Sequence, residues 1–232
     1  MVHILKREFI DSFKSIRSIL IILFITYISY KSAAFFADNP GVIHEFIESS
    51  DDAKSVYTAA VALIVFMLGF LFVFATSHDL INKEIELKTI RLLVTKVSRV
   101  EILLGKLLGT LLFWIALISV SFGILSIYAS SWFPKDYFQI IIFLLYIVSF
   151  VQLMSTAIPH TKLTMFLGII LGLSLPIIGL ISLVSERWYW IPIKYILPYH
   201  YLEGSIVWMI IPCLIAIIYF FISMFIMQKR DL

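Results

Sequence analysis

Long apolar runs dominate the chain, and polar positions cluster in short segments between them. A membrane hydrocarbon core of about 30 Å is crossed by roughly 20 apolar residues in a helix. Six runs reach that length, so the pattern predicts an all-α membrane protein with six transmembrane helices. The predicted spans are Ile19–Ala37, Val56–Ser77, Leu107–Tyr128, Phe138–Ile158, Leu163–Val184 and Ile206–Met227.

Residues 1–18 have a different pattern, in which apolar residues would form one face of a helix and charged residues the other. Leu5, Phe9, Phe13 and Ile16 recur at helical spacing, and charged residues fill the positions around them. Such a stripe predicts an amphipathic helix that lies in the membrane interface before the first span. A simple basic flank of the first span is the alternative.

Residues 185–205, which precede the last predicted span, are too interrupted to cross a bilayer. Pro192 and Pro198 break the segment, and its many Trp and Tyr side chains suit the headgroup layer. We expect an extracytoplasmic re-entrant hairpin here. Its aromatic residues could anchor in lipid or close the outer end of a pathway, and both interpretations stay open.

The basic residues are distributed unevenly over the two sides of the predicted membrane. If the N-terminus is cytoplasmic, thirteen of the eighteen Lys and Arg residues fall in cytoplasmic segments. Basic residues favour the cytoplasmic side of a bilayer. We therefore expect both termini in the cytoplasm.

Composition excludes several classes of function. Only 14% of residues are charged, against about a quarter in a soluble domain. Cys213 is the one cysteine, which excludes an intrachain disulfide and a thiolate-cluster metal site. The net charge of +3 does not imply nucleic-acid binding. A phosphate-binding loop is also absent, because Val100 and Leu107 stand where its first glycine and its Ser or Thr belong. We expect neither enzymatic activity nor a cofactor on this chain.

The last five predicted spans contain no Asp, Glu, Lys, Arg or His. Carriers driven by ion gradients usually place ionisable groups or broken helices near the midplane, so this disfavours such a carrier. A sodium site of carbonyl and hydroxyl oxygens is the open alternative. In the fifth span, Gly168 and Gly172 permit close helix packing and Pro176 invites a kink. Ordinary packing within the chain and a mobile or dimer-facing helix beside a pathway both fit this pattern.

Residues 78–106 form a dense charged segment between the second and third predicted spans. Acidic and basic residues are mixed there, and apolar residues recur among them at Ile85, Ile90, Leu93 and Val97. A loop that serves only to orient the chain would need basic residues alone. The mixture instead favours a surface that receives a partner protein, in the manner of a helix that packs into a groove.

This segment resembles the motif that permease subunits of ABC-2 type transporters carry between their second and third spans. Lys88 stands where the family has glycine, and Lys96 stands where it has proline. The interfacial helix, the six spans, the outer hairpin and the basic C-terminus also resemble the family, so the resemblance covers the whole chain. The matched motif positions are Glu84, Glu86, Thr89, Leu93, Ser98, Arg99, Glu101, Gly105 and Lys106.

The resemblance implies one transmembrane permease domain over residues 1–232, in the plasma membrane of a bacterium. Such a subunit pairs with a second permease, identical or homologous, and with separate P-loop ATPase subunits that bind ATP and Mg. The expected cargo of this exporter is hydrophobic or amphipathic, such as a small peptide or a drug. A bacteriocin-immunity or sensory membrane complex without transport is the alternative, and an intramembrane hydrolase is less favoured. The residues expected to couple the chain to its ATPase are Glu84, Glu86, Ile90, Arg91, Leu93, Ser98, Arg99 and Glu101.

Overall fold

A computed structural model describes residues 1–39, 50–202 and 206–230. Every secondary-structure element in these ranges is a helix. Three short 3-10 helices, η1 (Trp188–Trp190), η2 (Pro198–Tyr201) and η3 (Ile206–Met209), accompany the α-helices. The α-helices are α1 (Val2–Lys14), α2 (Ile16–Asp38), α4 (Ser50–Ser77), α5 (Asn82–Glu86), α6 (Ile90–Val94), α7 (Arg99–Ala129), α8 (Pro134–Ala157), α9 (Thr161–Val184), α10 (Ile191–Ile196) and α11 (Ile210–Lys229).

Helices α2, α4, α7, α8, α9 and α11 are long and apolar enough to cross a membrane. Each matches one of the spans predicted from the hydropathy pattern, although α8 ends one residue before its predicted span and the first four residues of the last predicted span form η3. The all-α class with six helices able to cross a membrane is therefore confirmed, while the re-entrant character of residues 185–205 stays a prediction. The third span differs most, because α7 begins at Arg99 rather than at Leu107. Part of the first predicted outer loop, residues 40–49, and the end of the predicted hairpin, residues 203–205, lie outside the described residues.

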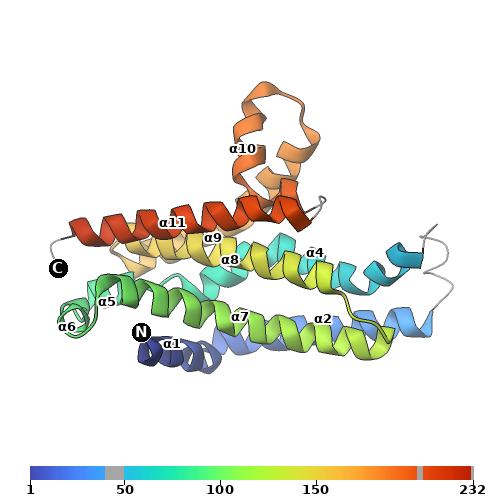
Figure 1. The fold of residues 1–232 in the computed structure, drawn as a ribbon, viewed down its shortest axis with the longest axis horizontal. Helices are drawn as coiled ribbons and strands as arrows, with labels where there is room; N and C mark the ends of the chain where they lie inside the picture. Colours follow the sequence, from blue (N-terminus) through green and yellow to red (C-terminus); the bar gives the residue numbers. More distant parts are fainter. Residues whose placement is uncertain (40–49, 203–205, 231–232) are drawn as a thin grey trace.

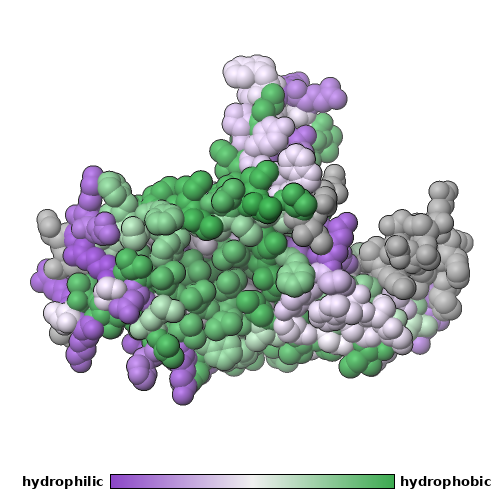
Figure 2. Space-filling view, in the orientation of Figure 1, coloured by the Kyte–Doolittle hydropathy of each residue, from purple (hydrophilic) through white to green (hydrophobic). Residues whose placement is uncertain are grey.

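The long helices lie side by side, and both chain ends are found at one end of the bundle with α1, α5 and α6 (Figure 1). Hydrophilic side chains gather at this end, which we call the charged end, and a broad apolar belt follows it along the bundle (Figure 2). The charged segment of the sequence therefore lies beside both termini, although the chain crosses the bundle several times between them.

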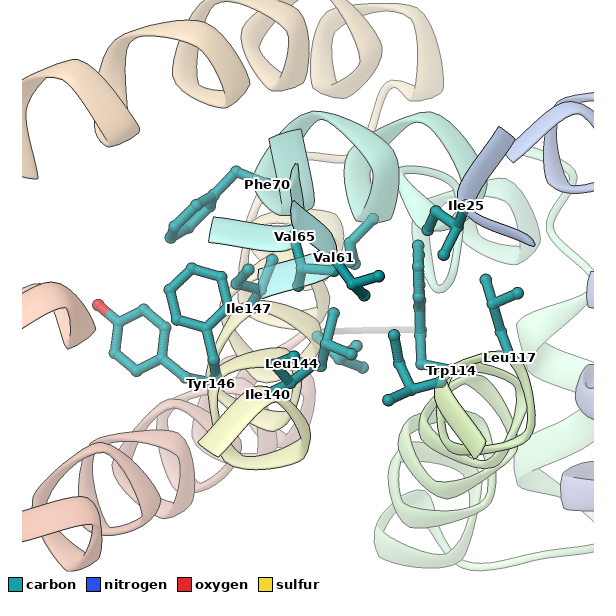
Figure 3. Close-up of a cluster of buried hydrophobic side chains, with 14 of the residues drawn as sticks. Ile25, Val61, Val65, Phe70, Trp114, Leu117, Ile140, Leu144, Tyr146 and Ile147 are labelled. Atoms are coloured by element: carbon teal, nitrogen blue, oxygen red, sulfur yellow. The ribbon is translucent and has the colours of Figure 1, made fainter. Parts of the chain in front are cut away.

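The core is formed by the inward faces of α2, α4, α7 and α8 (Figure 3). Trp114 of α7 and Phe70 of α4 are fully buried in it. Aromatic pairs meet edge to face, as with Phe66 and Phe143, whose ring centroids are 4.9 Å apart. Helix α9 packs on α4, and α11 packs mainly on α8. Much of the apolar surface of α9 and α11 is left exposed, as expected for lipid-facing helices.

Helix α1 packs against the first turns of α7. Gly105 and Gly109 make this approach possible: a Cβ atom on Gly109 would lie 2.8 Å from the carbonyl oxygen of Leu5. The apolar stripe of α1 turns partly toward α7, since the rings of Phe13 and Phe113 are 4.9 Å apart. Part of the stripe that we assigned to the membrane interface therefore packs on protein, and the interfacial position of α1 stays a prediction.

Residues 185–202, which we call the arm, project sideways from the bundle (Figure 1). The base of the arm is well packed. Tyr199 is 3% exposed, and its hydroxyl group donates a hydrogen bond of 2.9 Å to the carbonyl oxygen of Phe66 in α4. Burial raises the pKa of the Tyr199 phenol well above its ordinary value, so the hydroxyl keeps its proton and remains a donor. Gly179 of α9 leaves the space that the Tyr199 ring occupies.

Candidate functional site at the charged end

Residues 78–98, which we call the connecting segment, join α4 to α7 at the charged end. Residues 99–106, the rest of the predicted charged segment, form the first two turns of α7. Ser98 and Glu101 start that helix with a capping box: Ser98 Oγ accepts from the Glu101 amide at 3.3 Å, and Glu101 Oε2 accepts from the Ser98 amide at 3.2 Å. These two predicted coupling residues therefore define where α7 begins.

Lys88 lies between α5 and α6 in the left-handed region, with a φ of 57°. Residues other than glycine rarely adopt this backbone conformation, because it costs them about 1 kcal/mol. The ABC-2 motif that this segment resembles has glycine at the position of Lys88. The turn that glycine favours is thus formed here with lysine.

A chain of two buried ion pairs joins α5, α7 and α1. The ammonium group of Lys106 lies 2.7 Å from Glu8 Oε1 and 3.1 Å from Glu84 Oε1. All three side chains are largely withdrawn from solvent, with Lys106 only 5% exposed. Glu84 Oε2 is also buried and accepts no hydrogen bond from the described residues. Glu84, which the sequence predicts as a residue that couples the chain to an ATPase, therefore faces inward.

Glu86 connects α5 to the start of α9. Its Oε2 atom accepts hydrogen bonds from the Thr161 amide at 3.1 Å and from the Thr161 hydroxyl at 2.7 Å. A carboxylate at a helix N-terminus is stabilised by the unpaired amides and the helix dipole there. Glu86 thus acts as a cap for α9 supplied from a distant part of the chain.

Arg99 connects the start of α7 to the end of α11. Its Nη1 atom donates to the carbonyl oxygens of Met227, Gln228 and Arg230, at 2.8 Å for Gln228 and 3.3 Å for Arg230. The last carbonyls of a helix have no partner within the helix, and a cation is favourable at that end. Arg99 therefore holds the ends of two helices together.

The apolar residues of the connecting segment are also used within the chain. Ile90 is 2% exposed and packs in a small second core with Ile81, Ile102, Leu103 and Met227. Ile85 and Val97 pack against the same core. Ile90 is therefore placed inside the protein and not on a surface open to a partner.

Buried hydrogen bonds hold Ile81 and Asn82, near the start of the connecting segment, to α8 and α9. Ser155 Oγ accepts from the backbone amides of Ile81 and Asn82, at 2.8 Å and 3.2 Å. The side-chain amide of Asn82 donates to Thr164 Oγ1 at 2.7 Å. Because each of these groups is buried, a broken hydrogen bond would leave a polar atom without water or a partner.

One apolar and three basic residues of the connecting segment are exposed on the surface: Leu87, Lys88, Arg91 and Lys96. We call them the contact face. Leu87 is 63% exposed, which is unusual for a leucine at the charged end. Arg91 is the predicted coupling residue that lies on this face, and the side chain of Leu93 lies outside the described residues.

A cleft of about 780 Å³ opens beside these residues, between α1, the first turn of α2, the end of α4, α5 and α7. Glu8, Glu84 and Lys106 lie along it, and basic and acidic side chains are mixed over its walls. Arg17 crosses part of it and donates to the carbonyl oxygen of Ala75 at 3.2 Å. Among the described residues no group of three or more His, Cys, Asp or Glu side chains could hold a metal ion.

The three predicted pathway positions of α9 are buried within the chain, and the two glycines among them face α4. A Cβ atom on Gly168 would lie 2.6 Å from the ring of Phe74, and one on Gly172 would lie 2.8 Å from the Cα atom of Leu71. Pro176 is buried along the same stripe. Packing within the chain, one of the two interpretations left open above, accounts for these positions.

Several structural contacts were not anticipated from the sequence. The Ser98-x-x-Glu101 capping box and the Gly105-x-x-x-Gly109 pair are short patterns that could have been found by spacing. The pairing of Glu8 with Lys106 joins residues that are remote in the chain. Only the packing of α1 on α7 brings them together.

Comparison with known proteins gives the family. A search of curated proteins finds no significant match to the chain. The family model described as ABC-2 family transporter protein matches residues 2–187, which is well over half of the sequence. Together with the six long apolar helices, this match identifies a multi-pass membrane protein. The chain belongs to the ABC-2 family of transporter proteins.

Proposed function

We propose that this chain is the permease subunit of an ATP-driven exporter and that the connecting segment couples it to a separate ATPase. Proteins of this family work with ATPase partners and often pair with another permease. The observation that supports coupling is the way the segment is fastened. Glu84 ties it to α7 and α1, Glu86 ties it to α9, and Arg99 ties the adjoining turn of α7 to α11.

In this arrangement the predicted coupling residues have two different roles. Glu84, Glu86 and Arg99 hold the segment to the helices, while the contact face is free to meet a partner. A displacement of the contact face would be carried to three distant helices, because short charge-assisted hydrogen bonds and buried packing link them. Residues that fasten the segment and residues that touch the ATPase are then different residues.

The contact face indicates the chemistry of its partner. It presents one exposed leucine and the exposed basic side chains of Lys88, Arg91 and Lys96. An apolar groove with an acidic rim on the ATPase would complement it. The leucine would fill the groove, and the rim charges would set register and association rate more than affinity.

The rest of the proposal follows from this role. The charged end faces the cytoplasm of a bacterium, with both termini inside. ATP and Mg are bound by the ATPase subunits, and this chain has no catalytic activity of its own. A second permease, identical or homologous, completes the transmembrane part. Because the core of the bundle is apolar, the proposed cargo is a hydrophobic or amphipathic molecule such as a small peptide or a drug.

The test compares variants of the contact face with variants of the residues that fasten the segment, in cells that also produce the ATPase. Leu87→Asp and Arg91→Glu should reduce co-purification of the ATPase while the permease remains stable. Glu86→Ala and Arg99→Ala should leave the ATPase bound and the chain inserted but lower export, because each costs about 1 kcal/mol for an opened hydrogen bond near water. Lys135→Ala at the opposite end is the control and should change neither property.

Abundance, co-purification, ATP hydrolysis and export are measured on the same preparations. Normal export by the Leu87→Asp and Arg91→Glu variants at normal abundance would refute coupling through the contact face. A complex that assembles and hydrolyses ATP but moves no substrate would instead indicate the immunity or sensory role.

A further inference from the structure

The tip of the arm, which consists of η1 and α10, leaves most of its large apolar side chains uncovered by the described chain. No residue of η1 or α10 is buried. Trp188 is 80% exposed, and Ile191 and Ile196 are 51% and 53% exposed. A helix as short as α10 is not stable in water without tertiary packing. Helix α10 packs on α9, and among its apolar residues only Ile193 adjoins the core. The exposed apolar side chains of the tip therefore require apolar surroundings from outside the described chain.

The base of the arm, by contrast, is firmly built. The Tyr146 hydroxyl donates to the carbonyl oxygen of Ile196 at 3.1 Å, and the Gln139 amide donates to that of Leu202 at 3.0 Å. The Tyr201 hydroxyl donates to the carbonyl oxygen of Tyr195 at 2.9 Å. With Tyr199 seated between α4 and α9, these bonds hold the direction of the arm. Its sideways projection is a property of the fold and not of a loose loop.

The level of the arm along the bundle indicates what surrounds it. In Figure 2 the arm stands where the apolar belt gives way to paler surface, away from the charged end. It leaves the bundle at a steep angle to the long helices (Figure 1). If the apolar belt marks the hydrocarbon layer, a segment with this direction at its edge would lie in the plane of the membrane, at the boundary between acyl chains and headgroups.

The side chains of the tip suit that boundary better than a protein partner. Ile191 and Ile196 are both exposed although they lie about 140° apart around a helix of 3.6 residues per turn. A protein partner would cover one side, whereas a headgroup layer surrounds the segment. Trp and Tyr rings are typical of membrane interfaces. Arg187 and Lys194 add cations beside these rings, and lysine is depleted from the cores of protein interfaces.

We propose that the arm binds the phosphate-bearing headgroup layer of the leaflet opposite the charged end. The aromatic rings of the tip lie at the level of the headgroups, and Arg187 and Lys194 reach lipid phosphates by extending their aliphatic stems. This interaction fixes the height of the bundle in the bilayer at Tyr199. It is independent of coupling to an ATPase.

The experiment uses the full chain, with Cys213 replaced by Ser, in vesicles of phosphatidylethanolamine and phosphatidylglycerol. Nitroxide labels are placed singly at Ile191→Cys and Ile196→Cys. Leu173→Cys, exposed on α9 within the apolar belt, is the acyl-chain control, and Lys96→Cys is the aqueous control. Accessibility to oxygen and to a water-soluble nickel chelate is measured by electron paramagnetic resonance.

Both arm labels should be reached by both reagents, with an oxygen-to-nickel ratio between those of the two controls. A ratio equal to that at Lys96 would place the arm in water and overturn the proposal. Exclusion of both reagents would indicate a protein partner, such as a second copy, and would also overturn it. A ratio equal to that at Leu173 would place the arm in the acyl core and refute the headgroup position.

Discussion

Lys106 shows how a charge can lie inside this bundle. Its ammonium group is shared between Glu8 and Glu84, and all three side chains are largely buried. Removing one member of such a group strongly lowers the stability of the folded state, because the remaining buried charges keep their desolvation penalty. Replacing every member by a neutral group of similar size removes that penalty.

We therefore expect Lys106→Met to lower the free energy of unfolding by about 3 kcal/mol, since two buried carboxylates lose their counter-charge. The triple variant Glu8→Gln, Glu84→Gln, Lys106→Met should recover much of this loss. Thermal unfolding of the purified chain in mild detergent measures both. Lys83→Ala is the control, because the pair of Lys83 with Asp79 is exposed and contributes about 0.5 kcal/mol or less. A Lys106→Met variant as stable as this control would contradict the buried ion-pair chain.

At the scale of elements, α1 depends on the glycines of α7 that it crosses. A Cβ atom on Gly109 would lie 2.8 Å from Glu8 Cβ and from the backbone oxygen of Leu5. Backbone cannot move aside as a flexible side-chain end does. At Gly123, on the same helix, no other described part of the chain comes within 4 Å of such a Cβ position. The two glycines thus differ in whether another described helix approaches them closely.

Gly109→Ala should therefore detach or shift α1 and destabilise the chain by about 2 kcal/mol, the usual cost of overpacking. Gly123→Ala should be neutral or stabilising by up to about 1 kcal/mol, because alanine favours the helix. Hydrogen exchange of the amides in residues 2–14, followed together with thermal stability, checks both. Faster exchange in α1 for both variants alike, or for neither, would disagree with a close approach at Gly109.

At the scale of the whole molecule, the charged end gathers segments that are far apart in the chain. Helices α1, α5 and α6 and both chain ends meet there, and the arm projects from the bundle away from this end (Figure 1). The proposed orientation places the charged end in the cytoplasm, where the ATPase would bind. This assignment makes a prediction about which side of the membrane each end faces.

A cysteine at Lys96 should react with an impermeant thiol reagent only after cells are permeabilised, in a chain with Cys213 replaced by Ser. A cysteine at Lys135, at the start of α8, should react in intact cells. Both side chains are exposed, so the difference reports the membrane side and not burial. Labelling in the opposite order would invert the proposed topology, and equal labelling would contradict it.

The amino-acid sequence by itself determined the six long helices and their approximate limits. Runs of apolar residues long enough to cross a bilayer leave few other structures, because backbone groups in lipid must be hydrogen-bonded within the segment. The charged segment between α4 and α7 was located in the same way, since charge stands out against an apolar background. The family motif added the positions of Glu84, Glu86 and Arg99.

Only the tertiary structure decided which way those residues face. Glu84 and Glu86 are two positions apart, yet one is buried against Lys106 and the other caps α9 from the surface. Ile90 looks like an apolar contact for a partner but lies in a core shared with α11. In a helix as short as α5 or α6, with five residues, the apolar positions do not repeat often enough to indicate which face points inward. Its orientation is set by partners such as Glu8, Thr161 and the end of α11, which are remote in the chain and adjacent only after folding.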